Sequence, residues 1–264
     1  MYLENFKSIL IERRGPAVYA TMNRPELLNC INGALDFDMM RLIWEFDLDP
    51  TAEVLIITGA GRAFSAGGDI EYMRETQDPA KFHQGIKQGK KILNGILTCE
   101  KPIIARVNGD AIGLGATIAL FCDIVIADEK ARFADPHVHV GLAAGDGGAI
   151  IWPQLIGHAR AKRYLLGGEL INGRDAADIG LIAFAVPAEE LDAKVDEWVK
   201  RFTVNAASRA IRYTKTTLNL SLLQSFNHMV DAGFAYEMLS SQSADHVEAI
   251  DAFEAKRKPK FIGK

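Results

Sequence analysis

The stretch Val107–Asp123, VNGDAIGLGATIALFCD, decides how this chain of 264 residues folds. An apolar run from Pro102 to Val107 predicts a strand that leads into it, and the small residues from Gly113 to Phe121 predict a helix that leaves it. Small residues let a ligand approach the peptide N–H groups closely, and the first turn of a helix leaves such groups unpaired. We therefore expect this turn to stabilise a negatively charged oxygen without any charged side chain.

A second glycine-rich turn, Phe64–Ile70 (FSAGGDI), follows a β-branched run at Val54–Thr58 that is typical of a buried parallel strand. Two such turns that each donate one N–H to the same oxygen would form an oxyanion hole. The alternative is that both turns are only tight packing points, because glycine-rich turns after strands are common.

Composition favours a globular protein with a large core. The chain is 48% hydrophobic with a formal net charge of −4, which argues against general nucleic-acid binding. The basic cluster Lys256–Lys260 is either a frayed, solubilising tail or a phosphate contact. No apolar run reaches the ~20 residues that a membrane span needs, and the charged N-terminus does not resemble a signal peptide. Three cysteines (Cys30, Cys99 and Cys122) without a CxxC pair indicate reduced thiols, so we expect a cytoplasmic protein.

The order of predicted elements indicates the α/β class. Strands are expected at 8–12, 17–22, 54–58, 102–107 and 122–127, with a helix at 32–47, a polar and mobile stretch at 71–84, and a helix from there to 97. Strand–helix–strand alternation with short links implies parallel crossovers. Beyond Trp152 helices dominate, at 158–167, 174–180, 189–203, 206–219, 222–241 and 244–256, with one strand at 181–186. We expect a core at 1–200 followed by a C-terminal helical segment at 201–264.

Five blocks in this order resemble the crotonase (enoyl-CoA hydratase/isomerase) superfamily. They are NRPELLNCIN at 23–32, GAGRAFSAGGDI at 59–70, KPIIARVNGDAIGLGATIALFCDIVIA at 101–127, ARFADPHVHVGLAAGDGG at 131–148 and the C-terminal EAIDAFEAKRKPKF. The resemblance implies a crotonase (ClpP-like) ββα-spiral core with a C-terminal helical trimerisation segment. It also implies a homotrimer or dimer of trimers that binds acyl-CoA thioesters and needs no cofactor besides the CoA of its substrate.

Matched position by position, the resemblance assigns the oxyanion-hole donors to the backbone N–H groups of Gly68 and Leu114. These would hold the thioester carbonyl and stabilise the oxyanion that develops. The remaining substrate-binding residues that it implies are Ala66, Gly67, Asp69, Ile70, Gly113 and Thr117.

The sequence departs from the family at both glutamates that hydratases use to activate water. Thr117 and His137 stand at those positions. A threonine hydroxyl is too weak a base for this work, so Thr117 orders a water or simply fills a helix. An imidazole can move a proton near neutral pH, so we expect His137 to be the acid/base and Asp146, nine residues on, to assist it. The plainer alternatives are a hydrogen-bonded wall residue for His137 and a helix N-cap for Asp146.

These features predict an enoyl-CoA hydratase/isomerase-like enzyme of uncertain reaction. The histidine–aspartate pair also resembles a branch of the superfamily that hydrolyses carbon–carbon bonds in β-diketones, and a non-catalytic acyl-CoA-binding protein is a third alternative. His139, two residues from His137, would face the same side on an extended backbone. HxH alone is an unspecific metal pattern, so we expect no metal site.

Overall fold

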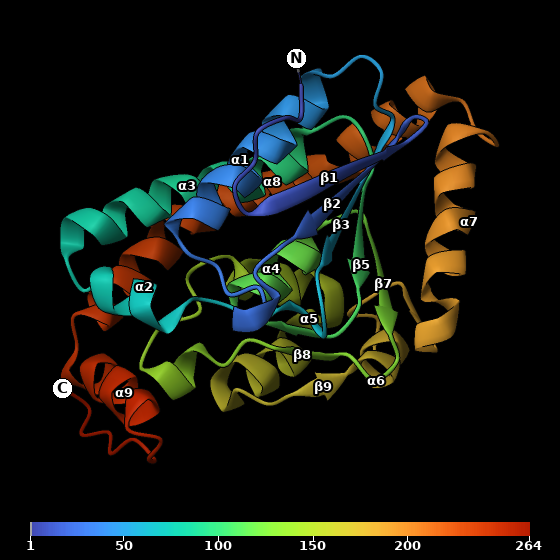
Figure 1. Cartoon of the computed structure of the whole chain (residues 1–264). Helices are drawn as coiled ribbons and strands as arrows, with labels where there is room; N and C mark the ends of the chain where they lie inside the picture. Colours follow the sequence, from blue (N-terminus) through green and yellow to red (C-terminus); the bar gives the residue numbers. More distant parts are fainter. Residues whose placement is uncertain (1) are drawn as a thin grey trace.

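Two β-sheets organise the chain in the computed structural model, which describes residues 2–264 (Figure 1). The larger sheet has the strand order β1-β2-β3-β5-β7-β10, and only the β1–β2 pair is antiparallel. Its strands are β1 (Ile9–Arg14), β2 (Ala17–Met22), β3 (Val54–Gly59), β5 (Ile103–Val107), β7 (Ile124–Asp128) and β10 (Phe184–Val186). The smaller sheet, in the order β4-β6-β8-β9, consists of β4 (Ala63–Ser65), β6 (Asp110–Ile112), β8 (Arg132–Ala134) and β9 (Ile171–Asn172). The α/β class is confirmed.

Alternate side chains of the central strands enter two separate cores. All six residues of β3 are buried; Leu55 and Ile57 join the larger cluster, whereas Val54 and Ile56 join the smaller one. The smaller cluster lies under α7 (Leu191–Thr203), and the larger one receives α1 (Gly33–Leu48) and α3 (Pro79–Thr98). A parallel strand covered on both faces has no polar alternation, which explains its unbroken apolar sequence.

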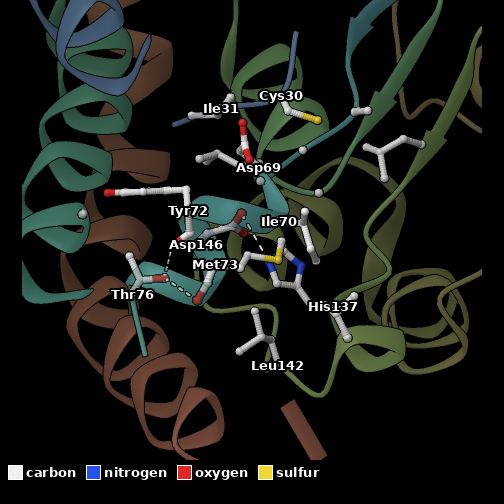
Figure 2. Close-up of a pocket in the computed structure, with 18 of the residues that line it drawn as sticks. Cys30, Ile31, Asp69, Ile70, Tyr72, Met73, Thr76, His137, Leu142 and Asp146 are labelled. Atoms are coloured by element: carbon white, nitrogen blue, oxygen red, sulfur yellow. Dashed lines mark hydrogen bonds and ion pairs between the residues drawn. The ribbon is translucent and has the colours of Figure 1, made fainter. Parts of the chain in front are cut away.

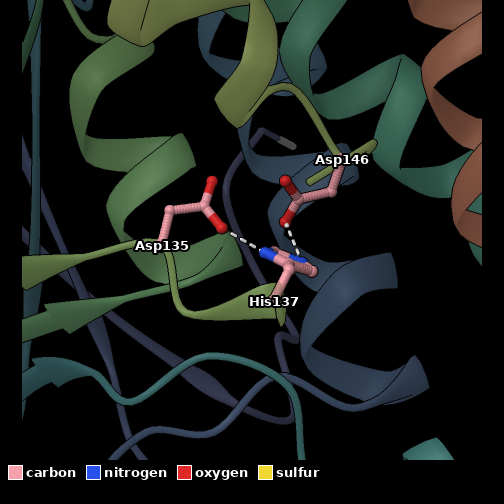
Figure 3. Close-up of side chains that lie close together, drawn as sticks. All are labelled: Asp135, His137 and Asp146. Carbon is pink, nitrogen blue, oxygen red and sulfur yellow. Dashed lines mark hydrogen bonds and ion pairs between the residues drawn. The ribbon is translucent and has the colours of Figure 1, made fainter. Parts of the chain in front are cut away.

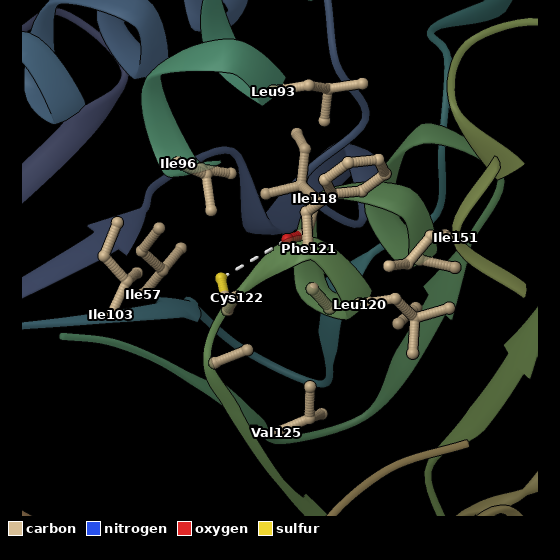
Figure 4. Close-up of a cluster of buried hydrophobic side chains, with 14 of the residues drawn as sticks. Ile57, Leu93, Ile96, Ile103, Ile118, Leu120, Phe121, Cys122, Val125 and Ile151 are labelled. Atoms are coloured by element: carbon tan, nitrogen blue, oxygen red, sulfur yellow. Dashed lines mark hydrogen bonds between the residues drawn. The ribbon is translucent and has the colours of Figure 1, made fainter. Parts of the chain in front are cut away.

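Helix α4 (Leu114–Phe121) lies at the centre of the larger core, as the opening stretch predicts. Figure 4 shows Ile118 and Phe121 of α4 among side chains from α3, β3, β5 and α5 (Gly148–Gly167). Small residues on α4 allow this helix to be almost fully buried, and its first turn is held directly behind the turn at Gly113.

The stretch 71–84, expected to be mobile, is mostly helical. Helix α2 (Ile70–Glu75) begins where the Asp69 carboxylate accepts a hydrogen bond from the Glu71 N–H, and α3 begins where Asp78 does the same for Ala80. These helices were not expected because a helix that lies between solvent and a cavity has little apolar periodicity, although both caps are visible in the sequence. The mobility of the stretch stays a prediction.

The C-terminal helices also differ from expectation. The helices expected at 206–219 and 222–241 form one helix, α8 (Ser208–Ser241), because no glycine or proline lies at the expected break to end it. Helix α5 begins ten residues earlier than expected, with a kink at Gly157. The remaining helices are α6 (Gly173–Asp178), α9 (Ala244–Glu254) and the short 3₁₀ turns η1 (Pro25–Leu27), η2 (His137–Val140) and η3 (Ala188–Glu190).

Helix α8 packs against α3 and α5 and contributes Phe226, Val230 and Phe234 to the larger core. The boundary expected at residue 200 falls inside α7, and the division into 1–200 and 201–264 stays a prediction. None of the helices described over residues 2–264 is long and apolar enough to cross a bilayer. Cys99 and Cys122 are buried free thiols, and Cys30 is half-buried and free.

Candidate active site

A cavity of about 570 Å³ lies where the two glycine-rich turns meet helices α2, α3, α8 and α9 (Figure 2). It is lined by nine of the ten site residues expected from sequence: Ala66, Gly67, Gly68, Asp69, Ile70, Gly113, Leu114, His137 and Asp146. The tenth, Thr117, is fully buried and lies behind Asp146. One cavity therefore collects both turns and both proposed acid/base residues.

The two turns touch each other at Gly67 and Gly113. A Cβ on Gly67 would lie 2.9 Å from the Ile112 carbonyl oxygen and 3.8 Å from the Gly113 Cα, and both glycines have positive φ, +91° and +53°. A Cβ on Gly113 would lie 3.8 Å from Cε1 of His137. Side chains at these positions would thus separate the turns and crowd the imidazole.

The N–H groups of Gly68 and Leu114 are left available by the local hydrogen bonding. Gly68 forms an isolated bridge with Ile31, but the bonds of that bridge use the Gly67 carbonyl (2.8 Å) and the Asp69 N–H (2.9 Å). Leu114 is the first residue of α4, where an N–H has no partner within the helix. Over residues 2–264 neither N–H donates a hydrogen bond, so both are free to bind a ligand oxygen.

His137 is held between two carboxylates (Figure 3). Its Nδ1 is hydrogen-bonded to Oδ1 of Asp135, and its Nε2 lies 3.5 Å from Oδ2 of Asp146. All three side chains are buried. The sequence reasoning missed Asp135, although an acidic residue two positions before a candidate histidine, across Pro136, was a signal that could have found it.

The charges around His137 favour its protonated form. Burial acts to lower the pKa of His137, but the negative charges of Asp135 and Asp146 outweigh it and hold the pKa well above its usual value. Burial raises the pKa of Asp146, while the charge of His137 opposes that rise. The surroundings therefore favour an imidazolium at His137, next to an aspartate that burial makes a stronger proton acceptor than a free carboxylate.

Asp146 is fixed by a loop made almost entirely of glycine. The Thr117 hydroxyl donates to Oδ1 of Asp146 (3.3 Å), and the Gly148 N–H is 3.4 Å from the same oxygen. A Cβ on Gly145 would lie 2.1 Å from the Gly233 carbonyl oxygen of α8, and one on Gly148 would overlap Asp135. The glycines thus let α8, α4 and Asp135 close around the carboxylate. The first residue before α5 is Gly147, so Asp146 is not its N-cap.

His139 lies outside the site. Residues 137–140 form the 3₁₀ turn η2 rather than extended backbone, so the two histidines point in different directions, and His139 is exposed and packs on Gly168. The residues that bring one potential metal ligand atom each within 4.8 Å are instead Asp135, His137 and Asp146. Because both imidazole nitrogens already face a carboxylate, an ion-paired histidine accounts for this grouping.

Two further buried acids, Glu237 of α8 and Asp36 of α1, line the cavity. Burial and the charge of Asp146 raise the pKa of Glu237 to about 8 and that of Asp36 to about 7. Neither was expected from sequence, since each comes from a helix remote in the chain and has no recognisable motif around it. The cavity wall thus contains two buried acidic side chains in addition to the proposed acid/base residues, His137 and Asp146.

The raised pKa of Glu237 predicts a pH-dependent stability. The folded chain holds this proton more tightly than the unfolded chain, so the free energy of unfolding falls as pH rises from about 4.5 towards 8. Glu237→Gln removes this dependence. Between pH 5 and 8.5 we expect its Tm to fall less than that of the unmodified protein, by at least about 2 °C. The exposed Glu189→Gln is the control, and parallel Tm curves for Glu237→Gln would contradict the assignment.

At the rim of the cavity, Asp69 is paired with Arg24 (2.9 Å), and Phe253 of α9 contributes to the wall. Beyond α9, Arg257 of the basic cluster is paired with Glu248 at 2.5 Å, whereas Lys256 and Lys258 are exposed. Whether these lysines contact phosphate stays a prediction.

Comparison with known proteins identifies the family of the chain. The family model described as enoyl-CoA hydratase/isomerase matches residues 13–264. The chain is 32% identical to crotonyl-CoA hydratase of Syntrophomonas wolfei over 260 residues (98% of this chain and 99% of that protein). It is 34% identical to short-chain-enoyl-CoA hydratase of Clostridium acetobutylicum over 258 residues (95% and 96%).

Among solved structures, an enoyl-CoA hydratase/isomerase from Mycobacterium paratuberculosis superposes with a TM-score of 0.86 at 36% identity, covering 92% of this chain and 97% of that one. The fold, the order of the two glycine-rich turns and the family model agree with one another. The chain belongs to the enoyl-CoA hydratase/isomerase family, within the crotonase superfamily.

Proposed function

We propose that this protein acts on an acyl-CoA thioester and moves a proton next to its carbonyl group. The thioester oxygen would bind the N–H groups of Gly68 and Leu114, which stabilise the enolate-like oxyanion that forms. The observation that carries the proposal is the meeting of both turns with His137 at one point, given by the contacts of Gly67 and Gly113.

His137 and Asp146 would donate and accept the proton that moves next to the carbonyl group of the substrate. The imidazolium donates from Nε2, which faces the cavity and Asp146, and Asp135 holds the ring in place from Nδ1. Once His137 has given up its proton, the charges of both aspartates favour its return. One such acid/base unit is sufficient for a proton shift or for water addition in two steps. The two-glutamate mechanism of hydratases is absent, because Thr117 cannot act as a base.

The proposal is tested by turnover on a panel of 2-enoyl-CoA and 3-enoyl-CoA thioesters of increasing chain length. We expect hydration or double-bond migration of at least one thioester. Tight thioester binding without any turnover would instead support a non-catalytic acyl-CoA-binding protein.

The oxyanion hole predicts a specific loss at Gly67. Gly67→Ala introduces a Cβ at 2.9 Å from the Ile112 carbonyl oxygen and parts the two turns, so we expect kcat to fall by about 10²–10³-fold. Gly180→Ala is the matched control, because Gly180 also has positive φ (+81°) but lies outside the cavity with no atom within 4 Å of its Cβ position. Equal losses in the two variants would mean that backbone strain alone, rather than the oxyanion hole, explains the effect.

Hydrolysis of a β-dicarbonyl carbon–carbon bond is the second candidate, because the histidine and aspartate that the resemblance assigns to it do lie together, 3.5 Å apart. In this reaction water attacks one ketone, and the other carbonyl accepts the electron pair as an enolate. Release of a keto acid from a cyclic β-diketone, without activity on thioesters, would favour it.

We further propose that the chain assembles as a homotrimer or a dimer of trimers. Helix α8 exposes Tyr213, Leu218, Leu220, Tyr236 and Leu239, each more than 60% accessible, which is unusual for an unpartnered helix. Light scattering should return three or six times the chain mass of 28.9 kDa. A monomer would contradict the proposal.

A further inference from the structure

The part of the cavity around Asp36 and Glu237 is not explained by proton transfer at the thioester. Their side chains are 4% and 8% exposed, yet Oδ1 of Asp36 and Oε2 of Glu237 have no hydrogen-bond partner among residues 2–264. A buried polar atom without a partner is costly and rare in folded proteins. These two atoms are sealed from solvent, but the second oxygen of each carboxyl group, Oδ2 of Asp36 and Oε1 of Glu237, is not sealed and also has no hydrogen-bond partner among residues 2–264. Because both side chains line the cavity, a bound ligand can supply a partner to these second oxygens.

Both acids lie near enough to Asp146 for its charge to raise their pKa. Glu237 is placed by the contact between Gly145 and α8, where a Cβ on Gly145 would lie 2.7 Å from the Glu237 Cβ. Asp36 belongs to the first turn of α1, which begins at Gly33 beside the ring of Tyr72. Tyr72 extends between α1 and α3, with its hydroxyl 3.1 Å from the Cβ position of Gly85 (Figure 2). This end of the cavity therefore combines apolar walls with two carboxyl groups and a phenol.

We propose that this end of the cavity selects acyl groups that carry a neutral oxygen function, a hydroxyl or a keto group, on a distal carbon. Asp36 and Glu237 are the residues that bind this oxygen. The inference rests on the proposed function, because it takes the acyl chain to extend past His137 and Asp146 from a thioester held by the two turns.

The protonation of the two acids favours a neutral ligand. The pKa of about 7 for Asp36 and about 8 for Glu237 leaves each with a substantial neutral fraction near neutral pH, and a neutral carboxyl both donates and accepts a hydrogen bond. A hydroxyl group can donate to such a carboxyl group or accept from it, and a keto oxygen can accept the hydrogen bond that the neutral carboxyl group donates. A distal carboxylate would be repelled by Asp146, and a hydrocarbon chain would cover Oδ2 of Asp36 and Oε1 of Glu237 without giving them a hydrogen-bond partner.

Binding of matched saturated acyl-CoA thioesters tests the inference, since these bind without reacting. One thioester has a medium-length hydrocarbon chain and the other carries a hydroxyl on the penultimate carbon of the same chain. In an apolar pocket the hydroxyl weakens binding, because it loses its water without replacement. Here we expect the hydroxylated chain to bind about 10-fold more tightly by titration calorimetry.

Two double variants test whether Asp36 and Glu237 cause the preference for the hydroxylated chain. The double variant Asp36→Leu/Glu237→Met should lose or reverse the preference, whereas Asp36→Asn/Glu237→Gln, which keeps hydrogen-bonding groups of the same size, should retain it. Equal or tighter binding of the hydrocarbon chain by the unmodified protein would overturn the inference while leaving the proposed function intact. Tighter binding of a thioester whose acyl chain ends in an ammonium group than of the hydroxylated thioester would also overturn the inference. Failure to bind either thioester would overturn the proposed function and the inference together.

Discussion

Replacement of His137 by alanine is expected to lower kcat/KM for the accepted thioester by about 10²–10⁴-fold, the usual contribution of general acid–base catalysis. The imidazole lies between two carboxylates, and its Cε1 lies 3.8 Å from the position that a Cβ on Gly113 would take. The loss should appear mainly in kcat, because the two turns that hold the thioester remain in place. Steady-state kinetics on a thioester that the unmodified protein turns over provide the measurement.

His139→Ala is the matched control for this experiment. His139 is two residues away on the same 3₁₀ turn, but it is exposed and packs on Gly168 outside the cavity. We expect its kinetics to be unchanged. Fast turnover by His137→Ala would contradict the role of His137 directly.

The second large effect is expected at Asp135, a residue that has no contact with the cavity in which substrate would bind. Asp135→Asn keeps the size of the side chain but removes the charge that holds the imidazolium, so we expect a loss of about 10²–10⁴-fold in kcat. The pH profile of kcat distinguishes this role from a structural one. Because Asp135 raises the pKa of His137, the limb of the profile that reports loss of the imidazolium should move to lower pH in the variant.

A double variant sharpens this test. If Asp135 acts through His137, then Asp135→Asn should cost little further activity once His137 is alanine, because residues that act as a unit are strongly non-additive. Additive losses would show that Asp135 acts on its own, for example by supporting the loop at Gly148. Circular dichroism and Tm of each variant report whether the fold is kept.

The residues around the two turns were predictable because their chemistry is local. The two glycine-rich turns are visible in the sequence, and the resemblance to the crotonase superfamily assigned the N–H groups of Gly68 and Leu114 within them. His137 was found as a departure at a position where hydratases of the family have a glutamate, and Asp146 as the carboxylate nine residues after it. The structure places all four in one cavity.

The residues that were missed depend on packing between distant elements. Glu237 reaches the cavity because α8 packs closely on the loop at Gly145, a contact between segments about 90 residues apart in the chain. Asp36 faces inward because α1 meets α2 through Gly33 and Tyr72. His139 was expected to share a face with His137, which required extended backbone that the turn after Pro136 does not provide. Periodicity describes one element at a time and carries no information on such contacts.

The most direct test of the central claim is a crystal structure of the protein with a saturated acyl-CoA thioester bound. We expect the thioester oxygen to lie about 2.7–3.1 Å from both the Gly68 and the Leu114 nitrogen atoms, with the acyl carbons next to the thioester facing His137. A thioester oxygen that contacts neither nitrogen, or an acyl chain that leaves His137 facing only Asp135 and Asp146, would contradict this claim.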